Sequence, residues 1–305
     1  MIERKYASAQ ALEQAVRSAA RKSQRDTSRE IAGFYRDRLL CRIFSEPHPR
    51  FILKGGQSQL ARRTDARETK DIDLVGITVE IERAVEDLKE LAAVDLHDYI
   101  DFRFLNARPI PVSQEYRTGM RVEFAPVLGK TKRLSVIGID LVVDQTPPED
   151  YVLVSPASRL DIAGLPTYDY ALQTIEERIA DKICAMMQMY EGAPSSRVKD
   201  LVDLVVSKLT DEVDADALLI KLHRESMLRN MEHFKIVHVP KDWTTTKTSV
   251  YKKEAERASI PPKLTDVVQA ETAVASWLEP VLRGELAHKK WNPRAQRWID
   301  VQLST

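Results

Sequence analysis

Cysteine is scarce in the sequence, and this bounds its cellular compartment. Only two cysteines, Cys41 and Cys184, occur in 305 residues, and both stand in apolar helical patterns. A secreted scaffold held by disulfides would carry more, so we expect two buried thiols and a reducing, cytoplasmic environment. The first residues, MIERKYASAQALEQ, lack the apolar core of a signal peptide. No run approaches the roughly 20 apolar residues that span a bilayer, so we expect no membrane partner.

Several common catalytic signatures are also missing. The six histidines show no metal-ligand spacing, and no serine stands in a nucleophile motif. Neither GxxxxGK[ST] nor GxGxxG occurs, so the chain has no P-loop and no dinucleotide fingerprint. These absences argue against zinc sites, hydrolytic triads and the commonest nucleotide-binding loops.

The net charge of zero hides an uneven distribution. Residues 1–50 contain 11 basic and 6 acidic side chains, residues 51–219 contain 20 and 30, and residues 220–305 contain 15 and 10. An acidic middle suits a site that holds cations, and basic ends suit a polyanion such as nucleic acid. A chance difference between solvated helix faces is an equal alternative.

One basic feature lies near the N-terminus. Arg17, Arg21 and Arg25 recur every four residues and would form one stripe on a helix. The stripe is compatible with RNA contact and with an ordinary solvated face.

Apolar spacing divides the chain into a mixed part and a helical part. It predicts helices over residues 8–23, 27–45, 79–91, 170–190, 195–208, 212–230 and 265–282. It predicts strands over residues 50–54, 71–76, 100–104, 120–127 and 134–143. We therefore expect an α+β fold, in which a small mixed sheet with N-terminal helices (residues 1–155) is followed by a C-terminal helical lobe (residues 156–305).

Two aspartates alternate with apolar residues in the predicted strand DIDLVG. Residues two apart in a strand face the same way, so Asp71 and Asp73 point together while Ile72 and Leu74 point to the other side. Two carboxylates this close repel each other unless positive charge lies between them. A bound Mg²⁺ would resolve the conflict, because it favours a few carboxylates together with substrate phosphates. A solvated sheet face is the alternative.

A third carboxylate stands in the apolar run LSVIGIDLVV. A lone aspartate in a buried strand is costly unless it is paired or bound to metal, which makes Asp140 a candidate ligand. If its strand lies beside the strand of Asp71, three carboxylates converge on two ions about 3.5–4 Å apart, an arrangement that supports in-line phosphoryl transfer. Asp144 is an alternative third ligand, but its place at the strand end predicts a solvated side chain.

A Gly-Gly turn precedes this strand. Lys54, Gly55 and Gly56 end one predicted strand and open a helix that Ser58 is expected to cap. Glycine lets backbone N–H groups approach an anion closely, and a helix N-terminus is partially positive. The sequence thus predicts a phosphate cradle beside the carboxylates, although an isolated Gly-Gly pair is often a simple turn.

Five ordered motifs resemble one family. FYRDRLLCRIF, FILKGG, TKDIDL, EERIADKICAM and RVKDLVDL follow one another through the first two thirds of the chain. This set resembles the nucleotidyltransferase superfamily, and more closely the AbiEii/AbiGii-type nucleotidyltransferase toxins, which include the mycobacterial MenT group. The resemblance implies a toxin with a cognate antitoxin. It also implies Mg²⁺-dependent transfer from an NTP, by family analogy a pyrimidine, to an acceptor such as the 3′ end of tRNA, which would block aminoacylation.

The resemblance also implies roles for individual residues. It makes Asp71, Asp73 and Asp140 metal ligands and catalytic residues. The nucleotide-binding loop falls on Lys54, Gly55, Gly56, Gln57 and Ser58, where Gln57 replaces the family's usual serine or threonine.

Two helical positions complete the catalytic set that the resemblance implies. The helical lysine falls on Lys182 and the later aspartate on Asp200, with Asp203 competing for that place. In some relatives a hydroxyl residue near Thr69 is phosphorylated, so Thr69 is a possible regulatory site. A noncatalytic relative that binds nucleotide or a partner, and an enzyme acting on a protein or a small molecule, are the alternatives.

Overall fold

The computed structural model describes residues 5–23, 25–64, 69–112 and 114–301. The chain forms two compact units, Met1–Gln173 and Thr174–Thr305. The sequence placed this boundary earlier, after residue 155. The difference arises because two short strands, Val152–Val154 and Tyr170–Leu172, pair with each other and the second of them pairs with the main sheet of the first unit.

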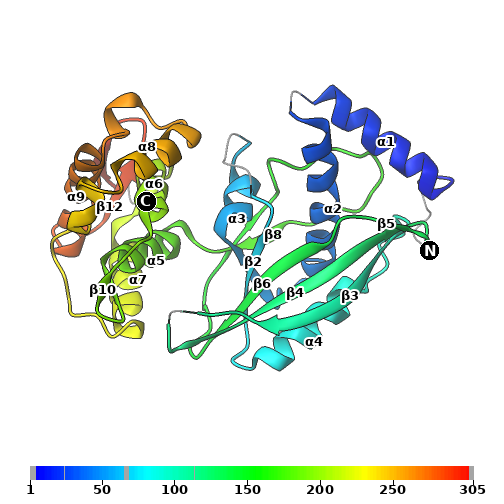
Figure 1. Cartoon of the computed structure of the whole chain (residues 1–305), viewed down its shortest axis with the longest axis horizontal. Coiled ribbons are helices and arrows are strands. Elements are labelled where there is room, and N and C mark those ends of the chain that lie inside the picture. Colours follow the sequence, from blue (N-terminus) through cyan, green and yellow to red (C-terminus); the bar gives the residue numbers. More distant parts are fainter. Residues whose placement is uncertain (1–4, 24, 65–68, 113, 302–305) are drawn as a thin grey trace. The chain divides into compact units, whose positions relative to one another are not determined.

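The first unit contains a sheet and four helices in its described residues (Figure 1). Its helices are α1 (Ala9–Lys22), α2 (Thr27–Ile43), α3 (Gly55–Arg62) and α4 (Ile81–Ala92). Its strands are β1 (Phe51–Lys54), β2 (Ile72–Gly76), β3 (Ile100–Pro109), β4 (Arg117–Leu128), β5 (Lys132–Arg133), β6 (Ile137–Asp144), β7 (Val152–Val154) and β8 (Tyr170–Leu172).

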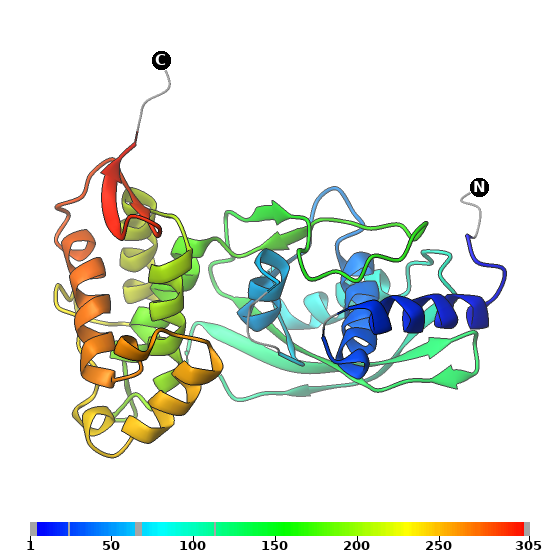
Figure 2. The same cartoon turned by 90° about the horizontal axis from the view of Figure 1, so that it is seen from above.

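The sheet of the first unit is mixed. Its strand order is β3-β4-β6-β2-β1-β8-β7, with β5 paired to β4. The pairs β2–β6 and β1–β8 are parallel, and the others are antiparallel. α1 packs against α2, the two blue helices of Figures 1 and 2. α2 and α4 contact each other, and α4 also contacts β6.

Residue alternation gives the central strands one core face and one polar face. Ile72 and Leu74 of β2 are fully buried in the same apolar cluster as Ile139 and Leu141 of β6. Asp73 and Asp140 lie between these residues and so belong to the opposite face. Burial of one face fixes the register, because a slip of one residue would carry the aspartates into the core.

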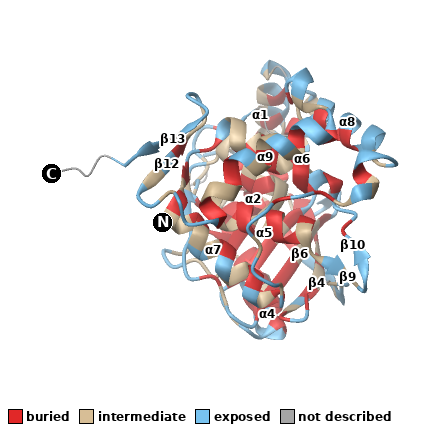
Figure 3. Cartoon of the chain, turned by 90° about the vertical axis from the view of Figure 1, so that its left-hand side faces the viewer, coloured by how far each residue is buried: buried red, intermediate tan, exposed pale blue. Residues whose placement is uncertain are grey.

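The second unit is mainly helical. Its helices are α5 (Ile175–Met187), α6 (Val198–Thr210), α7 (Ala215–Leu228), α8 (Thr248–Arg257) and α9 (Val267–Leu282), with 3₁₀ turns η1 (Lys241–Thr244) and η2 (Pro262–Leu264). Its short strands are β9 (Met189–Tyr190), β10 (Ala193–Pro194), β11 (Val213–Asp214), β12 (Lys289–Asn292) and β13 (Arg297–Asp300). Buried residues, red in Figure 3, line α5, α6 and α9, and Trp243, Trp277 and Trp291 lie in this core.

The fold class predicted from the sequence is confirmed: a mixed sheet with N-terminal helices precedes a helical lobe. The predicted helix over 170–190 is wrong at its start, because residues 170–172 form β8 and α5 begins at Ile175. α8 and the β12–β13 hairpin were not predicted. Cys41 and Cys184 are buried free thiols, as expected, and burial raises the pKa of Cys41 to about 11. No described helix has the length and apolar character needed to cross a membrane.

Candidate active site

Four charged residues lie in register across four neighbouring strands of the first unit. Lys54 on β1 is the partner of Asp73 on β2, Asp73 is the partner of Asp140 on β6, and Asp140 is the partner of Arg121 on β4. Partners in register point to the same face of a sheet. The polar face therefore carries two adjacent carboxylates with one cation on each side. We call these four residues, Lys54, Asp73, Asp140 and Arg121, the charge row.

Arg121 joins two of the three predicted ligands. Its Nη1 lies 2.8 Å from Oδ1 of Asp140, and its Nη2 lies 2.8 Å from Oδ1 of Asp71. Burial lowers the pKa of Arg121, but the hydrogen bonds to Asp140 and Asp71 outweigh this effect and the pKa is raised. Asp71 is the residue before β2 rather than part of the strand. The structure thus brings Asp71, Asp73 and Asp140 together at one place, around an arginine that the sequence reasoning missed.

The Gly-Gly turn lies directly against these carboxylates. Gly55 has a φ of +64°, and a Cβ at this position would lie 1.9 Å from Oδ2 of Asp73. A Cβ on Gly56 would lie 2.7 Å from Cγ2 of Thr69. Only glycine combines the left-handed conformation with this close approach. The N-terminus of α3, where unpaired N–H groups favour anions, is therefore adjacent to Asp73.

The neighbouring loop residues support the turn. The Ser58 hydroxyl donates to the Gly55 carbonyl oxygen at 2.9 Å, and the Gln57 amide donates to the Thr69 carbonyl oxygen at 3.1 Å. The expectation that Ser58 caps the helix is wrong, because α3 begins at Gly55 and Lys54 occupies the N-cap position without a side-chain cap. Thr69 lies two residues before Asp71 and would face the same side as Asp71 if the strand already began at Thr69. The strand begins at Ile72, and Thr69 instead packs on Gly56.

Asp144 belongs to a separate ion pair. Its carboxylate accepts hydrogen bonds from Nε and Nη2 of Arg117, at 2.6 and 2.9 Å. Both side chains are largely buried. The expectation of a solvated Asp144 is therefore wrong. Arg117 is its register partner on β4, so the long side chain covers the strand end that the sequence treated as open to solvent.

Lys182 and the two competing aspartates form a cluster within the second unit. The Lys182 ammonium lies 2.7 Å from Oδ1 of Asp200 and 3.0 Å from Oδ2 of Asp203. Asp200 also accepts from Nε of Arg197 at 2.6 Å. Burial lowers the pKa of Lys182, but the charges of Asp203 and Asp200 outweigh it and the pKa is raised. Lys182 is therefore a charged ammonium held by α6, and Asp200, the more buried of the two aspartates, connects it to Arg197.

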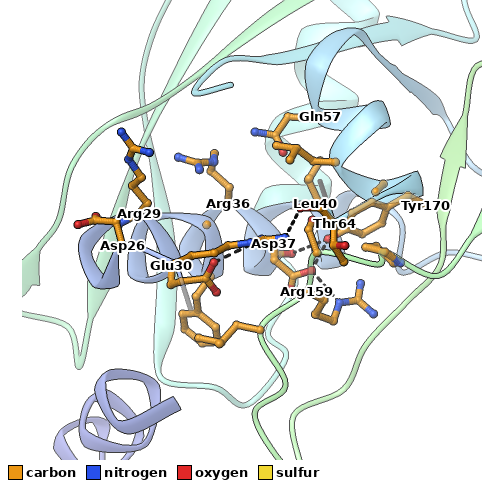
Figure 4. A pocket seen from close by; sticks show the side chains of 18 residues that line it. Asp26, Arg29, Glu30, Arg36, Asp37, Leu40, Gln57, Thr64, Arg159 and Tyr170 are labelled. Atoms are coloured by element: carbon orange, nitrogen blue, oxygen red, sulfur yellow. Dashed lines mark hydrogen bonds and ion pairs between the residues drawn. The ribbon is translucent and has the colours of Figure 1, made fainter. Parts of the chain in front are cut away.

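A cavity of about 270 Å³ lies between α2, α3 and the segment 156–170 of the first unit (Figure 4). Its wall includes Gln57 and two ion-paired arginines: Arg159 donates to Asp37 at 2.8 Å, and Arg25 lies 3.4 Å from Glu30. The charges of Arg159 and Arg25 are therefore compensated by carboxylates in or beside the cavity wall. No local sequence pattern predicts this cavity, because its wall comes from three separated segments.

The predicted stripe of Arg17, Arg21 and Arg25 does not form. α1 ends at Lys22, so Arg25 lies outside that helix and lines the cavity, where it also donates to the Thr64 carbonyl oxygen. Arg17 is engaged by Glu13 one helical turn earlier, at 2.8 Å.

The oxygen atoms of Asp71, Asp73 and Asp140 are suitable ligands for a magnesium ion. Mg²⁺ takes oxygen ligands and needs only one or two carboxylates when substrate phosphates supply the rest. Within residues 5–23, 25–64, 69–112 and 114–301, no group of three His, Cys, Asp or Glu side chains is arranged to hold a metal ion as it stands. Asp140 of the charge row and the nearby Asp71 are both engaged by Arg121.

Comparisons with known proteins identify the family. The family model described as "Nucleotidyl transferase AbiEii toxin, Type IV TA system" matches residues 38–284. A solved structure of JHP933 from Helicobacter pylori is 13% identical, with a TM-score of 0.42 over 83% of this chain and 93% of that one. A candidate nucleotidyltransferase from H. pylori is 13% identical, with a TM-score of 0.42 over 87% and 100%. No curated protein matches the sequence. Since the family model covers most of the chain, including the Gly-Gly turn, the charge row and the Lys182 cluster, the protein belongs to the AbiEii nucleotidyl transferase toxin family of type IV toxin–antitoxin systems.

Proposed function

We propose that the protein transfers nucleotides from an NTP, preferentially a pyrimidine, to the 3′ end of tRNA in a Mg²⁺-dependent reaction that releases pyrophosphate. The extended tRNA cannot be aminoacylated, so growth stops unless the cognate antitoxin intervenes, and the reaction belongs in the cytoplasm. One observation carries the proposal: Asp73, in register with Asp140, lies against the Gly55 backbone at the N-terminus of α3. A phosphate cradle and a pair of adjacent carboxylates thus share one place.

The chain's own groups divide the work of this site. The backbone around Gly55, Gly56 and Gln57 would receive the triphosphate, because glycine leaves the N–H groups accessible and the start of α3 is partially positive. Lys54 lies beside Asp73 in the charge row and Ser58 braces the turn through the Gly55 carbonyl. Asp71, Asp73 and Asp140 would hold Mg²⁺, which when bound neutralises phosphate charge and activates the attacking hydroxyl.

Lys182 and Asp200 keep the roles that the family resemblance gives them. The ammonium of Lys182 remains charged, and Asp200 and Asp203 fix its direction. We assign Lys182 as a catalytic residue that acts through its positive charge and Asp200 as the residue that positions it. Asp200 is favoured over Asp203 because it is buried and also binds Arg197.

The acceptor proposal rests on charge and on the chemistry of tRNA. The two ends of the chain are basic and the middle is acidic, which suits a long polyanion whose reactive end enters a cation-holding site. The tRNA acceptor end is single stranded and carries a free 3′-hydroxyl, so it can be positioned in line with an α-phosphate.

We predict that label from an NTP enters tRNA with an intact 3′-hydroxyl and does not enter tRNA whose terminal ribose has been oxidised. The hydroxyl is the nucleophile, so its loss removes the reaction rather than slowing it. Each of the four labelled NTPs is incubated with both tRNA preparations, and the products are separated on denaturing gels. Equal labelling of both preparations, or labelling of protein or small molecules alone, would rule out the 3′ acceptor.

Thr69 gives a second prediction, on regulation. Its methyl group packs on Gly56, so a phosphate on its hydroxyl would add about −1.5 to −2 charge beside the cradle meant for the triphosphate. We propose that Thr69→Glu lowers nucleotide transfer by about tenfold or more through this repulsion. Thr69→Val tests the loss of the hydroxyl alone, and Thr64→Glu places the same charge at an exposed site five residues earlier. Undiminished transfer by Thr69→Glu would refute the proposal.

A further inference from the structure

The Arg121 guanidinium lies over β6 in a space that Gly138 leaves open beside Asp140. Its guanidinium spans from Asp140 on β6 to Asp71 before β2. It passes over Gly138, where a Cβ would lie 2.3 Å from Nη2 and 2.5 Å from Cζ. Any side chain at Gly138 would therefore displace the guanidinium. Gly138 lies two residues before Asp140 on the same face of β6. The glycine therefore leaves the space for the guanidinium, and the carboxylate binds it.

The ion pairs of Arg121 differ from a structural pair on the same two strands. Arg117 and Asp144 form a bidentate pair with side chains only 12% and 10% exposed. The side chains of Arg121, Asp140 and Asp71 are 22%, 34% and 55% exposed. Partly solvated pairs are weak and readily broken. Arg121 therefore neutralises carboxylates that would otherwise repel each other, without fixing them permanently.

We propose that Arg121 is a resident counter-ion that competes with a divalent metal ion for Asp71 and Asp140. This inference rests on the proposed function, because it assumes that these carboxylates bind metal. One guanidinium nitrogen lies at hydrogen-bond distance from Oδ1 of each carboxylate, so a metal ion bound to the same two carboxylates would lie close to a positive charge. Metal binding must therefore weaken or displace these ion pairs, which lowers the metal affinity of the nucleotide-free protein.

The test measures binding of Mn²⁺ to full-length protein stripped with EDTA, by calorimetric titration without nucleotide. We expect Arg121→Gln to bind Mn²⁺ about tenfold more tightly than the wild type, equivalent to about 1.4 kcal/mol. Gly138→Ala should change affinity in the same direction by less, because the arginine is displaced but its charge remains. Arg108→Gln removes an exposed arginine 3.9 Å from Glu123 on the adjacent strand pair and should leave the affinity within about twofold.

Thermal melting provides a second readout. In EDTA, Arg121→Gln should melt at a lower temperature than Arg108→Gln, because its carboxylates lose their counter-ion. Added Mn²⁺ should abolish this difference in melting temperature. If Arg121→Gln fails to fold, Gly138→Ala serves as the variant for the binding test. The φ of Gly138 is not in the left-handed region, so alanine is compatible with its strand conformation.

The outcomes separate this inference from the proposed function. Equal Mn²⁺ affinity in the wild type, Arg121→Gln and Gly138→Ala overturns the competition and leaves the metal site standing. Retained binding in an Arg121→Gln, Asp140→Asn double variant places the metal elsewhere and also overturns it. Absence of Mn²⁺ binding in every variant without nucleotide overturns the competition, and its absence also in the presence of an NTP contradicts the metal-dependent function.

Discussion

Asp73→Asn is expected to fold like the wild type and to transfer nucleotide about a thousandfold more slowly or worse. Asp73 lies between Lys54 and Asp140 in the charge row and against the Gly55 backbone. Asparagine keeps the shape that fits this narrow space but loses the charge that binds a divalent ion. Losing several kcal/mol of metal-based transition-state stabilisation, at about 1.4 kcal/mol per tenfold, gives this magnitude. Initial rates of NTP incorporation with saturating Mg²⁺ measure it.

The controls separate chemistry from folding. Asp71→Ala should show a comparable loss, because it removes a second carboxylate from the same place, and it leaves Arg121 paired with Asp140. Asp101→Asn removes an equal charge from an exposed position on β3 and should keep full activity. Melting temperatures of all three variants close to that of the wild type would attribute the loss to chemistry. Full transfer by Asp73→Asn would show that the metal-site assignment is wrong.

Local patterns in the sequence were enough to find the strands that carry the carboxylates. The alternation of Asp71 and Asp73 with Ile72 and Leu74 follows from a period of two and a single buried face, and the structure has that face. Asp140 was found because a charge in an apolar run is costly. Both arguments use only neighbours along the chain, so they predict the strands and the face on which the aspartates lie, while the metal-binding role of these aspartates stays a prediction.

Pairing between distant strands could not be predicted in this way. Arg121 is an ordinary arginine in an alternating strand, and it becomes part of the site only because β4 pairs with β6 in the register that places it opposite Asp140. The error at Asp144 has the same origin, since its partner Arg117 lies on another strand. The domain boundary also depended on pairing, because β8 joins the sheet through Leu53 and Leu172.

A second large effect is expected from a buried cluster that no local sequence pattern predicts. Asp98 accepts from Nε of Arg38 at 2.7 Å and from Nη2 of Arg42 at 2.7 Å, and the three side chains are almost fully buried. Asp98 stands between His97 and Tyr99, whose φ values of 55° and 59° are unfavourable for non-glycine residues. The two arginines of α2 thus hold a strained loop that leads into β3.

We predict that Asp98→Ala lowers the free energy of unfolding of the first unit by about 3–5 kcal/mol, because two buried guanidinium groups lose their counter-ion. All four tryptophans, Trp243, Trp277, Trp291 and Trp298, lie in the second unit. Denaturant unfolding followed by circular dichroism should therefore show an earlier transition in the variant, while the transition seen by tryptophan fluorescence stays unchanged.

The pH dependence supplies an independent check on the same cluster. Burial raises the pKa of Asp98, but the hydrogen bonds and charges of Arg42 and Arg38 outweigh this effect. The pKa of Asp98 in the folded protein therefore lies below its ordinary value. A lowered pKa contributes stability above the unfolded value of about 3.9 and loses it as the pH falls further. The difference between Asp98→Ala and the wild type should thus be full at pH 7 and shrink below about pH 4. Asp95→Ala, at an exposed position in the same loop that accepts from the His97 backbone N–H, is the matched control. A loss no greater than that of the control would mean that the arginines do not hold the loop through Asp98.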